Sequence, residues 1–334
     1  MSIFVLTQRK KRLVLVTLGV FCVVAFFLSL GTGPSGVSFG WLFNNEEREL
    51  IAQLRIRRVV LALLTGAALA SAGTALQALL CNPLADPFII GVSGGAAVGG
   101  GIAICLGTGV SLFLLPASAF AGAMLSTLLL SWFLYRDGPQ STEATLLAGV
   151  VLNTFAAALV TLMKTALPAD RAQGLLFWLV GTIGYPDERT LWLIGVSIAL
   201  GIATLLMLSG DLEVMALGER EALRFGIDTK RLKWLTYGAT ALLVGVVIPF
   251  TGLIGFVGLA VPHLVKILIG SDLRLALPAS ALVGAGGLMI FDAVTRLSFL
   301  LVQTEIPVGA VTALFGAPVF AWVLVRHLST GVRP

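Results

Sequence analysis

The chain has 334 residues, of which 57% are hydrophobic and only 12% charged, with a formal net charge of +5. A soluble domain carries about 25% charged residues, and even a large one needs a polar shell. The composition therefore excludes an ordinary soluble protein and indicates a chain solvated mostly by lipid. The basic residues stand between apolar segments, so we expect a lipid bilayer as partner and no nucleic acid.

Apolar stretches of the length that spans a bilayer recur along the whole chain. In order they fall at 13–30, 59–80, 88–106, 112–135, 144–165, 190–209, 234–250, 253–269, 277–300 and 308–326. They predict an all-α integral membrane protein with about ten transmembrane helices, because about 20 residues cross the hydrocarbon layer as a helix. We expect residues 1–334 to form a single transmembrane domain.

A basic cluster at Arg9, Lys10, Lys11 and Arg12 precedes the first stretch. It resembles a signal peptide, but the apolar run is long and no A-x-A cleavage site follows. We interpret it as a first transmembrane helix with its basic end in the cytoplasm, which places both termini on the cytoplasmic side. Most other Lys and Arg residues fall in inner loops, but a group at 55–58 crowds an outer helix end.

Three stretches outside the apolar segments are long enough to carry structure. We expect an outer loop at 31–54, and a second at 168–189 whose apolar piece, 174–180, predicts a short re-entrant or interfacial helix. The longest inner loop, 210–233, has apolar residues among charges. That pattern predicts one or two short amphipathic helices, broken at Gly218 and Gly226.

The sequence carries no catalytic motif. The histidines, His263 and His327, form no H-E-x-x-H pattern, and neither G-x-S-x-G nor a Walker A lysine motif occurs. Cys22, Cys81 and Cys105 lack the paired spacing of a metal or disulfide site. We therefore expect no enzyme activity, no bound metal and no ATP site in this chain.

Two ionisable residues lie within the apolar stretch 277–300. Asp292 and Arg296 are four residues apart on one helix face, acid first, which is the favourable order for an ion pair. Charges at membrane depth are costly and commonly pair with each other. Two interpretations stay open, a neutralising structural pair and an anchor formed by Arg296 near the outer surface.

Proline and glycine interrupt three apolar regions, at 82–96, 249–263 and 307–318. Proline within a helix removes a backbone hydrogen bond, and irregular backbone at membrane depth is tolerated only inside protein or along a cavity. These regions are candidates for pore-lining breaks, with simple turns as the alternative.

Several ordered motifs together resemble those of one family, the FecCD-type permeases, which are the membrane subunits of ABC importers for iron chelates, haem and vitamin B12. The resemblance runs from about Leu54 to Arg326. The motifs are LRIRR at 54–58, NPLADP at 82–87 after Gln77, GVSGGA at 91–96, LAGV at 147–150, GLIGFVGLAVPH at 252–263, LPAS at 277–280 and IPVGAVTALFGAP at 306–318.

The resemblance implies a BtuC-like type II ABC importer permease in the bacterial inner membrane. It implies a homodimer with the path at the dimer axis and a periplasmic or extracellular substrate-binding protein docked outside. Cytoplasmic ATPase subunits would bind inside and would hold the ATP and Mg²⁺ that this chain lacks. Affinity for substrate can then reside in the binding protein rather than in the membrane path.

The resemblance also implies roles for particular residues. Arginines that dock acidic residues of the binding protein match Arg55, Arg58 and Arg296, and Arg57 stands where the family usually has proline. A cytoplasmic gate matches Asn82, Leu84, Ser141 and Thr142, while Cys81 stands where the family often has arginine. The coupling helices that receive the ATPase match Leu212, Met215, Leu217, Gly218, Glu219, Ala222, Leu223, Phe225 and Gly226.

The predicted function is ATP-driven import of an iron complex, either a siderophore or haem, by alternating access. The alternative substrate is cobalamin, because permeases for all of these share the motifs. A different class, an ion-coupled secondary transporter, would need ionisable groups within the membrane. Few such residues occur, with Asp292 and Arg296 the main pair, and this counts against that class.

Overall fold

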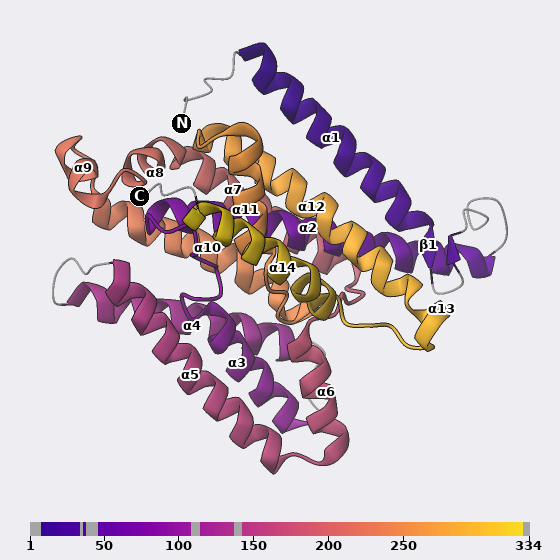
Figure 1. Ribbon diagram of the computed structural model, residues 1–334. Helices are drawn as coiled ribbons and strands as arrows, with labels where there is room; N and C mark the ends of the chain where they lie inside the picture. Colours follow the sequence, from indigo (N-terminus) through magenta and orange to yellow (C-terminus); the bar gives the residue numbers. More distant parts are fainter. Residues whose placement is uncertain (1–7, 34–35, 38–45, 108–113, 137–141, 330–334) are drawn as a thin grey trace.

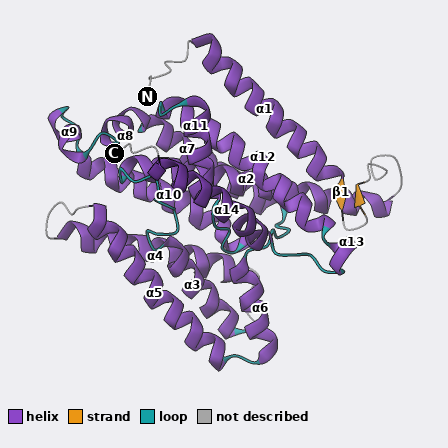
Figure 2. Ribbon diagram, in the orientation of Figure 1, coloured by secondary structure: helices purple, strands orange, loops and turns teal. Residues whose placement is uncertain are grey.

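The computed structural model describes residues 8–33, 36–37, 46–107, 114–136 and 142–329, and Figures 1 and 2 show that these are almost entirely helical. The longer helices are α1 (Gln8–Gly31), α2 (Glu46–Leu79), α4 (Leu114–Arg136), α5 (Thr142–Ala166), α7 (Glu188–Met207), α10 (Thr229–Thr251), α12 (Leu273–Leu297) and α14 (Val308–Ser329). The shorter helices are α3 (Val92–Leu106), α6 (Ala169–Val180), α8 (Ser209–Met215), α9 (Glu219–Arg224), α11 (Val257–Ile269) and α13 (Phe299–Val302). Strands β1 (Thr32–Gly33) and β2 (Gly36–Val37) form a small antiparallel pair after α1.

The described residues contain 7 helices that are long and apolar enough to cross a membrane, and shorter apolar helices at Val92–Leu106, Val257–Ile269 and Val308–Ala321. Every apolar stretch predicted from the sequence coincides with one of these helices. The all-helical, multi-pass fold is therefore confirmed. The number of about ten crossings and the cytoplasmic position of both termini stay predictions.

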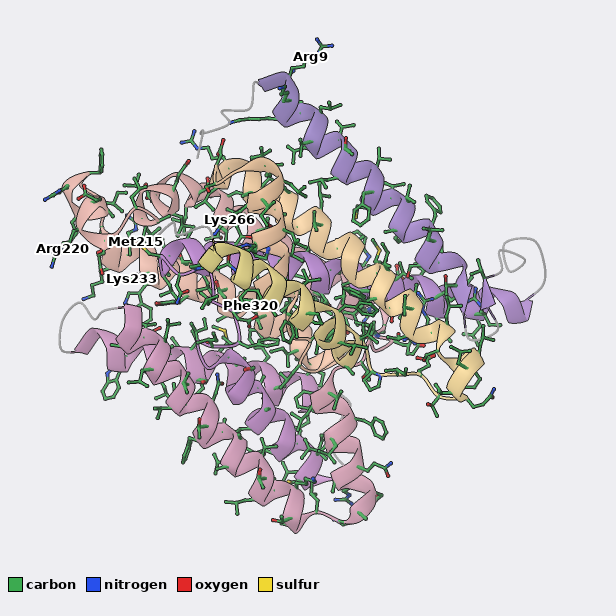
Figure 3. The ribbon with its side chains drawn as sticks, viewed as in Figure 1. Arg9, Met215, Arg220, Lys233, Lys266 and Phe320 are labelled. Carbon is green, nitrogen blue, oxygen red and sulfur yellow. The ribbon has the colours of Figure 1, made fainter. Side chains whose placement is uncertain are left out.

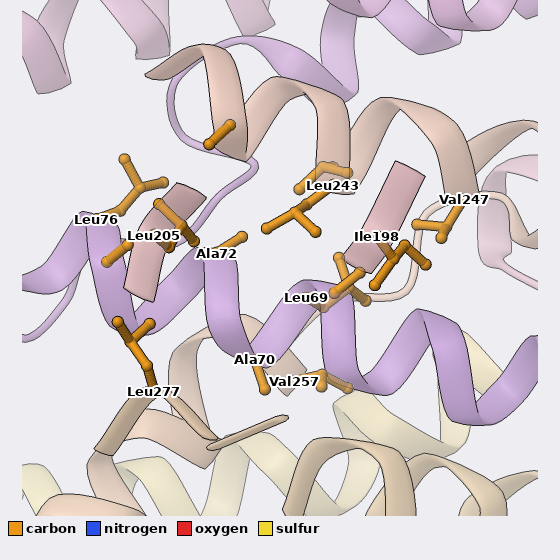
Figure 4. Packing of buried hydrophobic residues seen from close by; sticks show 14 of the residues in the cluster. Leu69, Ala70, Ala72, Leu76, Ile198, Leu205, Leu243, Val247, Val257 and Leu277 are labelled. Atoms are coloured by element: carbon orange, nitrogen blue, oxygen red, sulfur yellow. The ribbon is translucent and has the colours of Figure 1, made fainter. Parts of the chain in front are cut away.

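Helix α2 runs through the centre of the molecule, with α7, α10, α11 and α12 around it (Figure 1). Small residues allow this close packing. A Cβ atom on Gly66 of α2 would lie 2.1 Å from the carbonyl oxygen of Gly284 on α12, so these two helices meet backbone to backbone. Figure 4 shows the apolar side chains that fill the remaining space, among them Leu69, Leu76, Ile198, Leu205, Leu243, Val247 and Leu277.

A second group of helices, α3 to α6, lies to one side of this core (Figure 1). Its main contact with the core is between α4 of this group and α10 of the core. Helices α3 and α4 approach as closely as α2 and α12 do. A Cβ atom on Gly95 would lie 2.2 Å from the carbonyl oxygen of Gly122, and one on Gly122 would lie 2.2 Å from that of Gly95. Glycine at both positions is what permits this contact.

Helix α2 begins at Glu46, so the predicted outer loop at 31–54 is shorter than expected. Residues 46–58 contain no glycine or proline and are rich in good helix formers, so the helix extends past the membrane segment. The segment 168–189 contains the predicted short helix, α6, whereas its position outside the membrane stays a prediction.

Of the three helix breaks predicted at proline and glycine, two are present and one is not. Irregular backbone does separate α2 from α3, and it separates α10 from α11, where Gly252 and Phe256 both adopt positive φ. The break predicted at 307–318 is wrong, because α14 begins at Val308 and continues through Pro318. An interior proline removes one hydrogen bond and crowds the preceding turn, but helices of membrane proteins tolerate it where neighbouring groups satisfy the freed carbonyl.

Candidate functional site

Two buried arginines, one in the first half of α2 and one near the end of α12, share one carboxylate. Arg58 of α2 donates from Nε to Asp292 Oδ1 at 2.9 Å, and Arg296 Nη2 lies 3.1 Å from Asp292 Oδ2. The Asp292 side chain is fully buried. A carboxylate between two guanidinium groups satisfies the rule that buried charges must be paired. The structural ion pair predicted between Asp292 and Arg296 is present.

Arg58 has two further partners from distant parts of the chain. Its Nη1 donates to Glu305 Oε2 at 2.8 Å and to the Tyr185 hydroxyl at 2.7 Å, and the guanidinium lies 5.5 Å from the Tyr185 ring centroid. The Glu305 side chain, just before α14, is 35% exposed. Arg58 therefore ties α2 to α12 and to the segments before α7 and α14.

Arg296 is tied to the end of α1. It donates to the Ser29 hydroxyl and to the Thr32 carbonyl oxygen, each at 2.6 Å. Arg55, half-buried, packs its guanidinium against Gly33 in β1. The three arginines and two carboxylates, Asp292 and Glu305, form what we call the arginine cluster, which carries one net positive charge.

The burial of the cluster bears on the docking role expected of its arginines. As whole residues, Arg58 is 5% exposed and Arg296 is 3% exposed, and both already have partners within the chain. Docking at these residues stays a prediction, and it would require a partner carboxylate to replace one of these contacts. Sequence reasoning missed Glu305 and Tyr185, because their sequence separations from Arg58, 247 and 127 residues, leave no local pattern.

The loop between α2 and α3, which contains the predicted gate residues, is built from two side-chain turns. Asn82 Oδ1 accepts from the Leu84 amide at 2.9 Å, and Asp86 Oδ1 accepts from the Phe88 amide at 2.8 Å. Such turns are typical of Asn and Asp. Leu84 is left 43% exposed at the tip. Burial raises the pKa of Asp86 to about 6, against the opposing effect of its hydrogen bond to Phe88.

Asn153 of α5 holds this loop in place. It donates from Nδ2 to the Phe88 carbonyl oxygen at 2.9 Å, and its Oδ1 accepts from the Gly94 amide at 3.2 Å. Gly91, which precedes α3, has no side chain to cap the helix, so Asn153 satisfies an otherwise unpaired amide of the first turn. Sequence reasoning missed Asn153, since a cap from another helix leaves no local motif.

The other predicted gate residues lie at the start of α5. Thr142 is the first residue of that helix, and Ser141 lies outside the described residues. The gate formed by Asn82, Leu84, Ser141 and Thr142 therefore stays a prediction.

The loop at 210–233, predicted to lie inside, contains two short helices, as expected. They are α8 and α9, and the glycines at their ends, Gly218 with φ +125° and Gly226 with φ +78°, adopt the backbone conformation that side chains disfavour. Lys233 Nζ donates to Glu219 Oε1 at 2.6 Å and joins α9 to the start of α10.

These two helices have a buried side and an exposed side. Leu212, Met215 and Ala222 are at most 2% exposed and anchor the helices to the core, whereas Leu217, Leu223 and Phe225 are 58% to 72% exposed. The ATPase contact expected of these residues stays a prediction, which exposed apolar side chains grouped among charges suit. We call α8, α9 and these side chains the coupling surface, after that predicted role. Figure 3 places Met215, Arg220 and Lys233 at one end of the molecule.

Cys81 connects the gate loop to the coupling surface. Its Sγ donates to the carbonyl oxygen of Met215 in α8 at 3.0 Å. Partial burial, and then the Glu219 carboxylate, raise the pKa of the Cys81 thiol, so it remains a protonated donor. This hydrogen bond places Cys81, the residue before Asn82, in direct contact with α8.

An apolar cavity of about 120 Å³ lies between α11, α12 and α14, lined in part by Phe256, Phe291 and Phe315. Sites for drug-sized ligands occupy roughly 300–1,000 Å³, so this cavity does not hold a bulky substrate. Among the described residues, no group of three His, Cys, Asp or Glu side chains is placed to bind a metal.

The chain is similar to known proteins over nearly its full length. The model of the FecCD transport family matches residues 21–326. The vitamin B12 import system permease protein BtuC of Shigella boydii is 38% identical over 320 residues, which cover 96% of this chain and 97% of the relative, and the same protein of Escherichia coli matches equally.

Solved structures agree with this assignment. A metal-chelate type ABC transporter in an inward-facing conformation is 33% identical, with a TM-score of 0.83 over 94% of this chain and 99% of that one. PsaBC from Streptococcus pneumoniae, at 16% identity and a TM-score of 0.57 over 83% of this chain and 94% of that one, shares the fold. With its multi-pass helical fold and its match to the family model, the chain belongs to the FecCD transport family of type II ABC importer permeases.

Proposed function

We propose that two copies of this chain form the membrane path of a binding-protein-dependent importer in the inner membrane. ATP hydrolysis in separate cytoplasmic subunits would move the coupling surface, and the path would open alternately to each side. This chain itself would be a transport subunit and not an enzyme.

The coupling surface is the observation that carries this proposal. Leu217, Leu223 and Phe225 expose apolar area on short helices that are rich in charge, which suits a soluble partner better than lipid. The buried side of the same helices is fixed to the core, and Cys81 joins α8 to the gate loop. Force applied at this surface would thus reach the gate through a hydrogen bond and packed side chains.

A second copy is expected for the path because the cavity between α11, α12 and α14, at about 120 Å³, is too small for a bulky substrate. Exposed apolar residues of α5 and α14, including Leu147, Phe155 and Leu314, leave large surfaces for a partner helix or lipid. Substrate affinity would then reside in the binding protein, which would dock at the arginine cluster. Carboxylates pair with guanidinium groups in two parallel hydrogen bonds, which supports docking by acidic residues.

For the substrate we propose a bulky metal chelate, with cobalamin as the first candidate. The support is that the relatives at 38% identity are vitamin B12 permeases and that the similar structure at 33% identity is of metal-chelate type. The iron complex predicted from the sequence, either a siderophore or haem, becomes the second candidate, because metal-chelate importers include that class.

Two measurements test this proposal: the assembly of the permease with its partners, and the identity of the ligand that the binding protein retains. The purified chain, mixed with its ATPase and binding protein, should form a complex with two copies of the permease and two of the ATPase, measured by native mass spectrometry. The cognate binding protein, purified from cells, should retain a corrinoid identifiable by its absorption spectrum. An iron complex in its place would reassign the substrate, and failure to bind any ATPase would contradict the importer itself.

A further inference from the structure

Helix α1 leaves an apolar groove between itself and α11. The groove has a volume of about 270 Å³ and is lined by Leu13, Val14, Thr17 and Leu18 of α1 and by Val265, Leu268 and Ile269 of α11. Helix α1 is weakly packed, since only 22% of its apolar span is buried, against 83% for α2. Figure 1 shows it at the periphery, with its N-terminal end apart from the core.

An ion pair stands at the end of this groove. Lys11 of α1 pairs with Asp272, the residue that caps α12 just after α11 ends. Hydrogen bonding to Lys11 lowers the pKa of Asp272, so this carboxylate stays ionised and neutralised. Its negative charge therefore does not oppose an anion nearby.

Lys10 lies at the same end without such a partner. Lys10 is exposed, and it forms no ion pair with any of the described residues. In a helix, residues three, four and seven apart share a face. Lys10 thus lies on the face of Leu13, Val14 and Thr17, one turn beyond the groove, whereas Arg12 lies on the opposite face.

We propose that this groove binds one anionic phospholipid, with part of an acyl chain between α1 and α11 and the headgroup phosphate on Lys10. The apolar groove suits the acyl chain of such a lipid, and Lys10 at the end of the groove suits its phosphate. Each basic residue near an anionic lipid surface contributes roughly fivefold in binding. The bound lipid would fill the space that α1 leaves and would fix α1 against α11. This inference does not depend on the transported substrate.

The test is a lipid titration of the full chain in detergent micelles, followed by native mass spectrometry. Phosphatidylglycerol should bind at one tight site, and phosphatidylcholine with the same acyl chains should bind at least about tenfold more weakly. Lys10→Glu should weaken phosphatidylglycerol binding about thirtyfold, because two charge units change beside the headgroup. Arg12→Glu, with the same charge change on the opposite face, should have less than about a fivefold effect.

A second pair of variants tests the groove itself. Thr17→Trp fills it and should abolish tight binding, whereas Val16→Trp, on an exposed position outside the lining, should leave it unchanged. Equal binding of the two lipids, or equal effects within either pair of variants, would show a non-specific lipid annulus and overturn the proposal. Displacement by excess inorganic phosphate would show that only the headgroup is held and would overturn it as well.

Discussion

At the scale of single residues, the buried charges of the arginine cluster dominate. Asp292 is the shared counterion of Arg58 and Arg296, and all three are almost completely buried. Removal of one partner of a buried ion pair typically costs about 3–5 kcal/mol, because the remaining charge is left uncompensated. Glu305 differs, because its side chain is 35% exposed and its pairing with Arg58 can exchange with another carboxylate.

We therefore predict that Glu305→Gln strengthens docking of the binding protein. The substitution removes a competing anion from Arg58. Because the Glu305 side chain is 35% exposed, solvent screens this partly buried pair, which we expect to be worth about 1 kcal/mol, or roughly fivefold in affinity at low salt. Surface plasmon resonance on the purified permease would measure the change. Glu221→Gln, which breaks the exposed pair with Arg224 on α9, is the matched control and should have no effect. Unchanged or weaker docking would contradict a role for Arg58 in the contact.

Asp86 gives a prediction for the dependence of stability on pH. Burial raises its pKa in the folded protein to about 6, from 3.8, so ionisation of Asp86 opposes folding. The stability that the protonated form gives is present below pH 3.8 and is lost as the pH rises through about 6. Asp86→Asn keeps the oxygen that accepts from Phe88, and should be more stable than the native protein by up to about 3 kcal/mol at pH 8, at about 1.4 kcal/mol for each unit of pKa shift.

The measurement is thermal unfolding in detergent at several pH values. The advantage of Asp86→Asn should shrink towards pH 4, where native Asp86 is mostly protonated. An advantage that is constant with pH, or a loss of stability at pH 8, would contradict this account of Asp86.

Sequence reasoning identified the residues of these sites unevenly. Arg55 and Arg58 stand out because they crowd a helix end predicted to lie outside, and Arg296 because it lies within an apolar stretch; the family resemblance then implied a common role for them. Glu305 and Asn153 stand in segments without any distinguishing pattern, and only the packing of distant helices gives them their partners. Contacts of this kind depend on tertiary structure and cannot be read from local spacing.

At the scale of elements, the coupling surface and the glycine contacts have the clearest consequences. Helices α8 and α9 are too short to be stable alone, and they owe their position to the buried side chains Leu212, Met215 and Ala222. Their outward side chains contribute little to folding and are available to a partner. The two sides of one element can therefore be separated by substitution.

We predict that Leu223→Asp combined with Phe225→Asp abolishes ATPase binding but leaves the permease folded. These side chains are 58% and 71% exposed, so a charge there costs little folding energy, whereas loss of central apolar contacts at an interface costs about 2 kcal/mol or more each. Co-purification with the ATPase and the melting temperature would report the two effects. Leu301→Asp, at an 87% exposed position in α13, is the control and should retain the ATPase. Retained binding in the double variant would exclude this surface.

The contact between α2 and α12 gives a second prediction at this scale. A Cβ atom at position 284 would lie 2.3 Å from the Gly66 carbonyl oxygen, so Gly284→Ala must push the helices apart and should destabilise the protein by about 1–3 kcal/mol. Gly287→Ala lies on the same helix with no atom within 4 Å and should be neutral or slightly stabilising, because alanine favours helix. Thermal unfolding compares the two, and equal melting temperatures would show that the close contact is absent.

The helices themselves were largely predictable, because each apolar stretch is long and continuous. The residues at which the helices begin and end were not predictable. Helix α2 starts at Glu46, outside the apolar stretch, since nothing in 46–58 stops a helix, and α14 passes through Pro318 without a break. Composition locates the buried part of a helix, whereas its ends depend on caps and neighbours.

At the scale of the whole molecule, the apolar exterior defines the protein. Large side chains such as Leu147, Phe155 and Trp192 are 64% to 70% exposed over the outer helices, as expected for a protein surrounded mostly by lipid. Composition alone predicts this property. The arrangement of α2 at the centre, with α3 to α6 as a group at its side, depends on helix contacts that only the structure gives.

The central claim is that this chain forms a path opened by ATP hydrolysis in a partner. The most direct measurement is uptake of radiolabelled cobalamin into proteoliposomes that contain the permease and its ATPase, with the loaded binding protein outside. We predict uptake that requires ATP inside and the binding protein outside, that persists after ionophores collapse all ion gradients, and that is lost in the Leu223→Asp, Phe225→Asp variant. Uptake by the permease alone, driven by an ion gradient without ATPase, would contradict the account.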